Sequence, residues 1–209
     1  MNISPVFPTL LGQFRFGPEE SASVNAELEA LILRRESVEP SSRLSNVGGW
    51  HSKADLLEGD APAIGKLRAW IIESVNRMIE ATYESTKAMG MHRPFQGKLQ
   101  LSAWANVSRK THYHRIHNHP GSAWSGVYYV KAGTSPADQP LSGVIEFLDP
   151  RGFTEMVAVP GEPYGQKIVL RAEAGTMLIF PGFLYHFVNP YMGEGERISI
   201  AFNVAALKG

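Results

Sequence analysis

The sequence predicts an α+β domain in which N-terminal helices pack on one face of a β-sandwich. Two stretches within the first 90 residues repeat apolar side chains every three or four positions, which is the period of an amphipathic helix. After Pro94 the pattern changes to short apolar or alternating runs separated by Gly, Pro and Asn, which indicates strands. Helices first and strands afterwards are typical of the α+β class.

The helical part begins with residues 19–35, whose apolar positions lie on one face of a helix. A longer amphipathic helix is expected from Pro62, a residue that suits a first helical turn, to Gly90, a residue that suits a helix end. The Ser/Gly-rich stretch 41–52 between them is expected to be a loop.

At least six strands are expected in the remainder, each bounded by turn-forming residues. They cover residues 99–107, 125–130, 143–148, 167–171, 176–180 and 197–204.

The last of these strands predicts a cavity because its two faces differ in polarity. One face carries Ile198, Ile200, Phe202 and Val204, and the other carries Arg197, Ser199, Ala201 and Asn203. A strand with a polar inner face and an apolar outer face suits a jelly roll that holds a wet ligand cavity, with its apolar face packed on the amphipathic helix. The alternative is an ordinary sheet whose polar face meets water.

Length and composition indicate one ordinary globular domain over residues 1–209. Its hydrophobic content is 44% and its charged content is 19%. The N-terminal helical part is expected to cover about residues 1–92, and the jelly-roll core about residues 95–206.

The composition also excludes several classes of function. Lys and Arg together number 20, as do Asp and Glu, so we expect no nucleic-acid partner and no binding to an anionic membrane. Cysteine is absent, which rules out disulfides, thiolate metal sites and cysteine nucleophiles. No signal-peptide pattern and no apolar run of about 20 residues is present, so a cytoplasmic protein is expected.

Histidines form the most informative motif of the chain. Four of the seven lie within eight residues and a fifth follows downstream, namely His112, His114, His117, His119 and His186. Imidazole is the commonest metal ligand, and two side chains two apart on a strand point to the same side. An H-x-H pair can therefore bind one metal ion, which the downstream histidine would complete from another strand. A His-rich surface loop, or hydrogen-bonded core histidines, is the simpler alternative.

Arg197 opens the last strand, and Ser199 shares its face. A guanidinium fork with a nearby hydroxyl suits the planar carboxylate of a small diacid. An arginine in this position also commonly forms a surface ion pair. Tyr129 shares a strand face with Val127 and Ser125, so it either reaches the same carboxylate or belongs to the core.

These residues resemble the 2-oxoglutarate- and Fe(II)-dependent oxygenase superfamily, and within it a mostly bacterial and phage group. The likeness spans roughly residues 99–205. It is carried by HNHPGSAWSGVYYV at 117–130, FLDPR at 147–151, GTMLIFP at 175–181, HFVNP at 186–190 and RISIAFN at 197–203.

The resemblance implies a double-stranded β-helix and an iron-dependent oxidoreductase. It implies that Fe(II) is bound by His117, His119 and His186, in preference to His112 or His114. It implies that Arg197 and Ser199, with Tyr129, bind the far carboxylate of the cosubstrate 2-oxoglutarate. The expected activity is a dioxygenase that uses O2 to hydroxylate an unidentified substrate, with release of succinate and CO2.

One position departs from the superfamily pattern of two histidines and one carboxylate, because His119 stands where the carboxylate is expected. A neutral third ligand leaves the site one unit more positive. Glu146 and Asp149 are the alternative carboxylates, and Asp149 with Arg151 also suits a tight turn. A three-histidine cupin-type enzyme without 2-oxoglutarate, or a non-catalytic metal-binding jelly roll, are the rival hypotheses.

The sequence does not indicate which substrate is bound. Trp50, His51 and Trp104 either line the entrance or pack in the core, and we assign Trp104 to core or lid packing. The sequence also leaves the oligomeric state open, with a homodimer as one option because dimers are the commonest assemblies of globular proteins.

Overall fold

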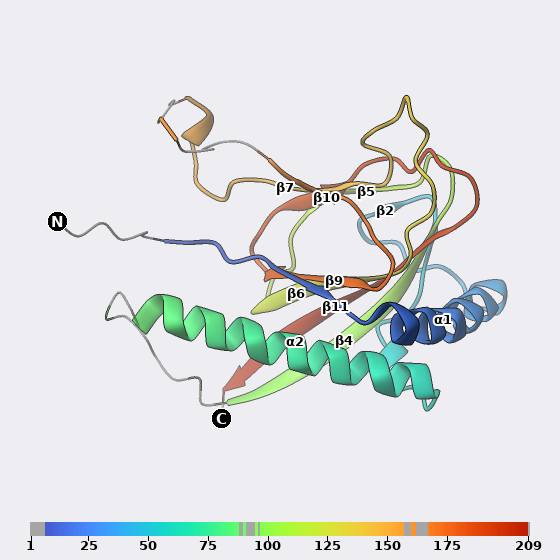
Figure 1. Cartoon of the computed structure of the whole chain (residues 1–209), viewed down its shortest axis with the longest axis horizontal. Helices are drawn as coiled ribbons and strands as arrows, with labels where there is room; N and C mark the ends of the chain where they lie inside the picture. Colours follow the sequence, from blue (N-terminus) through green and yellow to red (C-terminus); the bar gives the residue numbers. More distant parts are fainter. Residues whose placement is uncertain are drawn as a thin grey trace.

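The structure is a computed structural model that describes residues 7–87, 90, 95, 97–156, 160–161 and 167–208. Within these residues two N-terminal α-helices lie on a pair of antiparallel sheets (Figure 1), so the predicted α+β class is confirmed. The helices are α1 (Pro18–Val38), α2 (Pro62–Lys87) and the short 3-10 helices η1 (Leu56–Glu58) and η2 (Thr154–Met156). No helix in this part of the chain combines the length and hydropathy needed to cross a membrane.

The larger sheet has the strand order β1-β9-β6-β11-β4-β3. Its strands are β1 (Gly12–Arg15), β3 (Trp50–His51), β4 (Gly97–Ser108), β6 (Trp124–Lys131), β9 (Thr176–Pro181) and β11 (Arg197–Lys208). The longest pairing joins β11 to β4, from Arg197 opposite Ser108 to Lys208 opposite Gly97. The predicted strands 99–107 and 197–204 lie within this pairing.

The smaller sheet has the strand order β2-β5-β10-β7-β8 and lies opposite the larger one (Figure 1). Its strands are β2 (Asn46–Val47), β5 (Tyr113–His117), β7 (Ile145–Phe147), β8 (Ile168–Leu170) and β10 (His186–Val188). Inner-face residues of both sheets line a cavity between them, as the polarity of the last strand predicts.

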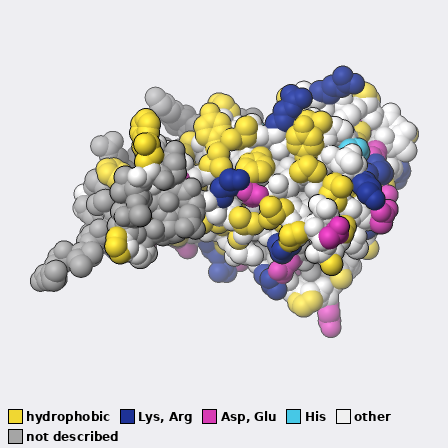
Figure 2. All heavy atoms as spheres, turned by 90° about the horizontal axis from the view of Figure 1, so that it is seen from above, with side chains coloured by type: hydrophobic (Ala, Val, Ile, Leu, Met, Phe, Trp, Pro, Cys, Tyr) yellow, Lys and Arg dark blue, Asp and Glu magenta, His cyan; other side chains and the backbone are white. Residues whose placement is uncertain are grey.

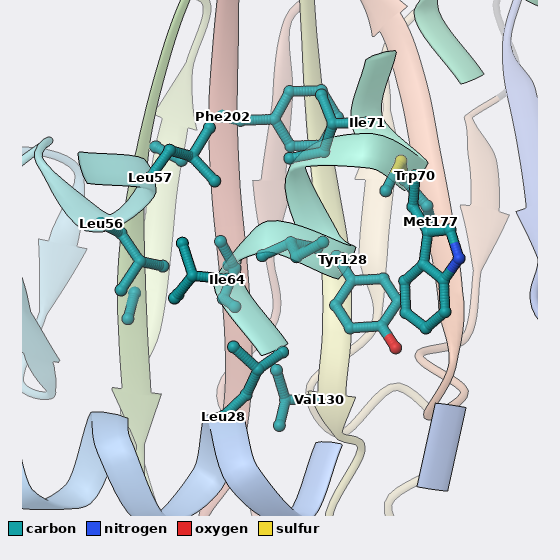
Figure 3. Packing of buried hydrophobic residues seen from close by; sticks show 14 of the residues in the cluster. Leu28, Leu56, Leu57, Ile64, Trp70, Ile71, Tyr128, Val130, Met177 and Phe202 are labelled. Atoms are coloured by element: carbon teal, nitrogen blue, oxygen red, sulfur yellow. The ribbon is translucent and has the colours of Figure 1, made fainter. Parts of the chain in front are cut away.

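The main apolar core lies between the larger sheet and the helices. Ile198, Ile200, Phe202 and Val204 of β11 are completely buried there. Figure 3 shows Phe202 and Tyr128 on the strands beside Ile71 and Trp70 of α2, and the rings of Trp70 and Tyr128 are 5.7 Å apart between centroids. Full burial of one such aliphatic or aromatic side chain contributes about 1.5–3 kcal/mol. The prediction that the apolar face of the last strand packs on the amphipathic helix is confirmed.

The stretch 41–52, expected to be a loop, contains the short strands β2 and β3. β2 pairs with β5 in the smaller sheet, whereas β3 pairs with β4 in the larger sheet. Gly48 and Gly49 between them have φ values of 65° and 63°, a left-handed backbone that glycine adopts at little cost. This turn carries the chain from one sheet to the other and closes one open edge of the sandwich.

Candidate functional site

A cavity of about 1270 Å³ lies between the facing surfaces of the two sheets. Inner-face residues of β4, β6 and β11 form one wall, and residues of β5 and β10 form the opposite wall. The segment 42–45 and the segment 51–54 form a side wall, because this part of the chain connects the sheet edges.

The three predicted metal ligands lie together in this cavity. One ligand nitrogen of His117, His119 and His186 lies within 4.8 Å of the corresponding atoms of the other two. His117 ends β5 and pairs directly with His186 at the start of β10, and their ring centroids are 4.3 Å apart. Within the described residues, no acidic side chain belongs to this cluster.

His119 reaches the cluster by a different route from the one the sequence predicts. The H-x-H argument assumes that both histidines lie on one strand, but β5 ends at His117. His119 lies in the following turn, where its backbone N–H donates to the carbonyl of Gly182 at 2.8 Å, and its own carbonyl accepts from the N–H of Ser122. Hydrogen bonds of the turn therefore place this side chain, instead of the alternation of a strand.

Backbone carbonyls orient two of the three imidazoles. Nδ1 of His117 lies 2.7 Å from the carbonyl oxygen of Arg115, and Nδ1 of His186 lies 2.9 Å from that of Leu184. A carbonyl oxygen only accepts, so each Nδ1 carries the proton and each Nε2 keeps its lone pair toward the cavity. Such an arrangement prepares a histidine to bind a metal ion.

Burial also keeps these imidazoles neutral. It lowers the pKa of His186 to about 3, with a further contribution from neighbouring His117, and lowers that of His119 to about 4. Burial likewise lowers the pKa of His117. At neutral pH the three rings are therefore unprotonated, which is the form that binds a metal.

The two upstream histidines have other positions. Nδ1 of His112 accepts a hydrogen bond from the backbone N–H of Arg109 at 3.0 Å, in the turn before β5. His114 lines the cavity, although it does not belong to the cluster of three, and its Nδ1 lies 3.3 Å from Oγ of Ser45. Between the paired positions of His114 and His117, Arg115 and Ile116 of β5 oppose Phe187 alone in β10, and this bulge turns both histidines inward.

Arg197 is buried on the cavity side of β11 and is not a surface ion-pair residue. Its side chain is 2% exposed, and its Nε has no hydrogen-bond partner within the described part of the chain. Burial lowers the pKa of its guanidinium. The guanidinium carbon lies 5.3 Å from the ring centroid of Tyr129, whose buried hydroxyl also lacks a partner there. Buried polar atoms are nearly always hydrogen-bonded, so unpaired ones beside a cavity indicate a ligand.

Ser199 and Asn106 extend this polar surface across neighbouring strands. Ser199 pairs with Tyr129 of β6 on one side and with Asn106 of β4 on the other. Asn106 is 5% exposed, lines the cavity, and its Oδ1 has no partner among the described residues. Sequence reasoning missed Asn106, although its place in the alternating strand 99–107 is the pattern that puts it on the inner face.

The alternative carboxylates lie outside the histidine cluster. Glu146 accepts a hydrogen bond from Nδ2 of Asn189 at 2.7 Å and pairs with Lys167 at 3.0 Å. Asp149 accepts hydrogen bonds from the backbone N–H and the guanidinium of Arg151, as the tight-turn interpretation predicts. Neither carboxylate replaces His119.

The candidate entrance residues divide between core and cavity. Trp50 belongs to the apolar core, and its indole N–H donates to the carbonyl of Glu39 at 3.0 Å. Trp104, which we assigned to core or lid packing, lines the cavity instead because it alternates with Ser102 and Asn106 on the inner face of β4. His51 also lines it, and its ring stacks on that of Trp104 with centroids 5.5 Å apart.

Comparison with known proteins identifies the class to which the fold and this site belong. The family described as "Putative 2OG-Fe(II) oxygenase" matches residues 102–203, which include most of both sheets. Over this stretch the chain matches the 2-oxoglutarate- and Fe(II)-dependent oxygenase family, as its sequence predicts. No curated protein sequence matches the chain.

Solved structures show the same architecture at low identity. A prolyl-4-hydroxylase from Pseudomonas putida superposes with a TM-score of 0.64 at 17% identity, over 95% of this chain and 93% of that one. A Trichoplax adhaerens prolyl hydroxylase, in complex with a peptide fragment of hypoxia inducible factor, gives 0.58 at 13% identity, over 93% and 83%. HygX from Streptomyces hygroscopicus, with nickel and 2-oxoglutarate bound, gives 0.54 at 15% identity, over 94% and 83%. These likenesses show the fold, which is the double-stranded β-helix of 2-oxoglutarate oxygenases.

Proposed function

We propose that the protein is a 2-oxoglutarate- and Fe(II)-dependent dioxygenase that hydroxylates a substrate held in the cavity. The observation that carries this proposal is the pairing of two features on facing walls of one cavity. Three neutral imidazoles converge on the smaller-sheet side, and a buried arginine with an unpaired Nε lies on the larger sheet.

The imidazoles fit a divalent metal ion in number, protonation and orientation. His117, His119 and His186 would hold Fe(II), with the Nε2 atoms of His117 and His186 left free by their Nδ1–carbonyl contacts. Because all three ligands are neutral, the metal would keep its full double charge. A site of this charge attracts an anionic cosubstrate more strongly than the usual site with one carboxylate.

The opposite wall fits the far carboxylate of 2-oxoglutarate. Arg197 would donate from its guanidinium, with the hydroxyls of Ser199 and Tyr129 as further donors. A charged hydrogen bond contributes about 1.5–3 kcal/mol, and burial keeps water from competing for it. An enzyme that used no keto-acid would leave the buried charge of Arg197 without a counterion, which is costly.

The bound metal and 2-oxoglutarate would supply the oxidation of a substrate C–H bond by O2, with succinate and CO2 as co-products. The residues of the chain bind and orient these groups. The three histidines would hold the metal and the larger-sheet wall would hold the far carboxylate of 2-oxoglutarate. The two walls would also limit the access of water, and the rest of the cavity would be left for the substrate.

An anaerobic titration with Fe(II) and then 2-oxoglutarate tests the proposal. A weak visible absorption band that needs both additions is expected, because it reports chelation of the metal by the keto-acid. His186→Ala should abolish iron binding, and Arg197→Met should keep iron binding but raise the 2-oxoglutarate concentration needed for the band. Iron binding without the band would support the three-histidine enzyme that uses no keto-acid. No iron binding would support a non-catalytic or zinc-binding jelly roll.

A further inference from the structure

We infer that the substrate is a small anion, bearing a carboxylate or a phosphate on an apolar or aromatic body. The anionic group would be received by a cationic mouth, formed by Arg43, Lys53 and Arg115. This inference rests on the proposed function, because it concerns the part of the cavity that the metal and 2-oxoglutarate would leave free.

The charge around the cavity is of one sign. Its lining includes Arg43, Lys53, Arg115 and Arg197, and no Asp or Glu is among the described residues that line it. The whole chain has equal numbers of basic and acidic residues, 20 of each. The cavity therefore has a charge imbalance that the rest of the molecule does not share. A concave surface lined by one sign of charge concentrates ligands of the opposite sign.

The three mouth cations also lack partners. Among the described residues, none of their side chains takes part in an ion pair or a hydrogen bond, and all three are exposed. Most basic residues elsewhere in the described part of the chain are paired, although exposed ones such as Arg34 are not. Arg35 lies 2.7 Å from Glu39, and Lys131 lies 2.7 Å from Glu29. The mouth thus leaves its cations available to a ligand.

Backbone hydrogen bonds bring the three mouth cations together. Residues 42 and 51 are joined by a backbone hydrogen bond of 2.8 Å, so the segments that carry Arg43 and Lys53 lie beside each other. The backbone N–H of Arg115 on β5 donates to the carbonyl of Ser45 at 2.9 Å. Three segments that are distant in sequence therefore place their cations around one opening.

The charge that remains after loading also favours an anion. The three imidazoles are neutral, one carboxylate of 2-oxoglutarate would pair with Arg197, and the other would offset one unit of the double positive charge of Fe(II). One unit at the metal and the three mouth cations would remain as uncompensated positive charge. A neutral substrate would leave this charge unbalanced, whereas an anionic substrate would reduce it.

The body of the substrate is indicated by the rings and apolar side chains along the same path. Trp104 stacks on His51 and lies 6.1 Å from His119 between ring centroids, so a flat aromatic surface extends beside the histidine cluster. Leu44 and Ile116 line the mouth and are 72% and 57% exposed. Apolar or aromatic contacts of this kind hold the body of a ligand while a few charges orient it.

Calorimetry on anaerobic protein loaded with Fe(II) and 2-oxoglutarate tests the inference with two matched pairs of probes. Phenylacetate is compared with phenylacetamide, and phenyl phosphate with phenol. At least one anionic probe should bind about tenfold more tightly than its neutral counterpart, and added salt should weaken that preference. The pair with the larger difference identifies the anion as carboxylate or phosphate.

Variants then assign the preference to the mouth. The triple variant Arg43→Gln, Lys53→Gln, Arg115→Gln should abolish it, whereas Arg34→Gln, an exposed arginine of α1 outside the cavity, should leave it unchanged. The charge-conserving pair Arg43→Lys and Arg115→Lys should retain the preference. Equal affinity for anionic and neutral probes, or a preference that survives the triple variant, would overturn the inference.

The same experiment separates this inference from the proposed function. If the visible band of the loaded protein appears but the anionic preference does not, only the inference fails. If the band never appears, the proposed function fails. The probe titrations are then repeated on metal-free Arg197→Met protein, where a preference that is lost in the triple variant still supports the cationic mouth.

Discussion

The two faces of β11 differ in how their side chains are satisfied. On the outer face Ile198, Ile200, Phe202 and Val204 are fully buried against the helices and need nothing from outside the chain. On the inner face Arg197 is also buried, but its Nε has no partner among the described residues. One face of the strand thus stabilises the fold, and the other face carries a buried hydrogen-bond donor without a partner among the described residues.

The comparison teaches that burial alone does not identify a structural residue. Fully buried apolar side chains stabilise the ligand-free protein. A buried unpaired cation destabilises it until a ligand binds. Outer-face substitutions should therefore affect unfolding, and inner-face substitutions should affect ligand binding. Figure 2 looks onto the molecule from the smaller-sheet side, where exposed hydrophobic side chains lie among Lys, Arg, Asp and Glu.

The largest effect is expected for Phe202→Ala. Removal of a fully buried ring leaves a cavity between β11 and α2 and should lower the free energy of unfolding by about 3–5 kcal/mol. Urea unfolding followed by circular dichroism measures this loss. The folded fraction should still bind metal in the same ratio. A change below about 1 kcal/mol would show that the outer face is not the main source of stability.

The next effect is a loss of stability in acid. Burial lowers the pKa of His114 to about 3, against 6.5 for an unperturbed histidine, and lowers the pKa of His186 to about 3 as well. Between about pH 3 and pH 6.5 the histidines of the unfolded chain bind protons that the buried histidines of the folded chain do not. The stability of the metal-free protein should therefore fall as the pH decreases below 6.5. Urea unfolding at pH 7 and pH 5 measures the change.

The variant His114→Gln supplies the control for this acid effect. It removes one of the groups with a lowered pKa, so its stability should depend less steeply on pH between 7 and 5. Equal stability of the unsubstituted protein at the two pH values would mean that the inner face already accommodates charged imidazoles.

Arg197→Met should separate binding from stability. The substitution removes a buried unpaired charge and keeps much of the side-chain volume, so the ligand-free protein should be as stable as before or more stable. Affinity for 2-oxoglutarate in the presence of Fe(II) should fall roughly ten- to hundredfold. Arg34→Met serves as the exposed control. A large loss of stability with unchanged 2-oxoglutarate affinity would show that Arg197 stabilises the fold and does not bind the cosubstrate.

Ser199→Ala should give the smallest effect. Loss of one hydroxyl from the inner face should weaken 2-oxoglutarate by about two- to tenfold, since a hydrogen bond contributes about 0.5–1.5 kcal/mol. Its free energy of unfolding should change by less than about 1 kcal/mol. Spectroscopic titration and urea unfolding measure the two quantities. An unchanged affinity would leave Arg197 and Tyr129 as the carboxylate donors.

Long elements with a clear period were predictable from the sequence. Both helices and the six expected strands appear close to the predicted ranges, because each has an apolar run or period of its own, even where, as in β8, most of its side chains are exposed. The strands β5 and β10, which carry His117 and His186, were not predicted. β10 has three residues and β5 is mostly polar, so neither shows an apolar pattern of its own. Pairing across the sheet, which is not local in sequence, defines them.

The same limit applies to the site. The identity of the three clustered histidines followed from the family pattern, and Arg197, Ser199 and Tyr129 followed from strand alternation. The place of His119 in a turn, and the bulge that turns His114 inward, depend on hydrogen bonds between distant segments. The exposed residues Arg43 and Lys53 carried no signal in the sequence, because a charged residue in a loop is ordinary until its neighbours are known.

The turn at Gly48 and Gly49 has a consequence for how such an enzyme diversifies. The segment around this turn closes one side of the cavity and carries Arg43 and Lys53. It contributes neither Arg197 nor any of the three clustered histidines. In the proposed enzyme, two of the three mouth cations would therefore lie apart in sequence from the metal ligands, whereas Arg115 lies on β5 with His117. Exchange of this N-terminal segment between homologous chains would be expected to change substrate preference and leave the residues of the metal site in place.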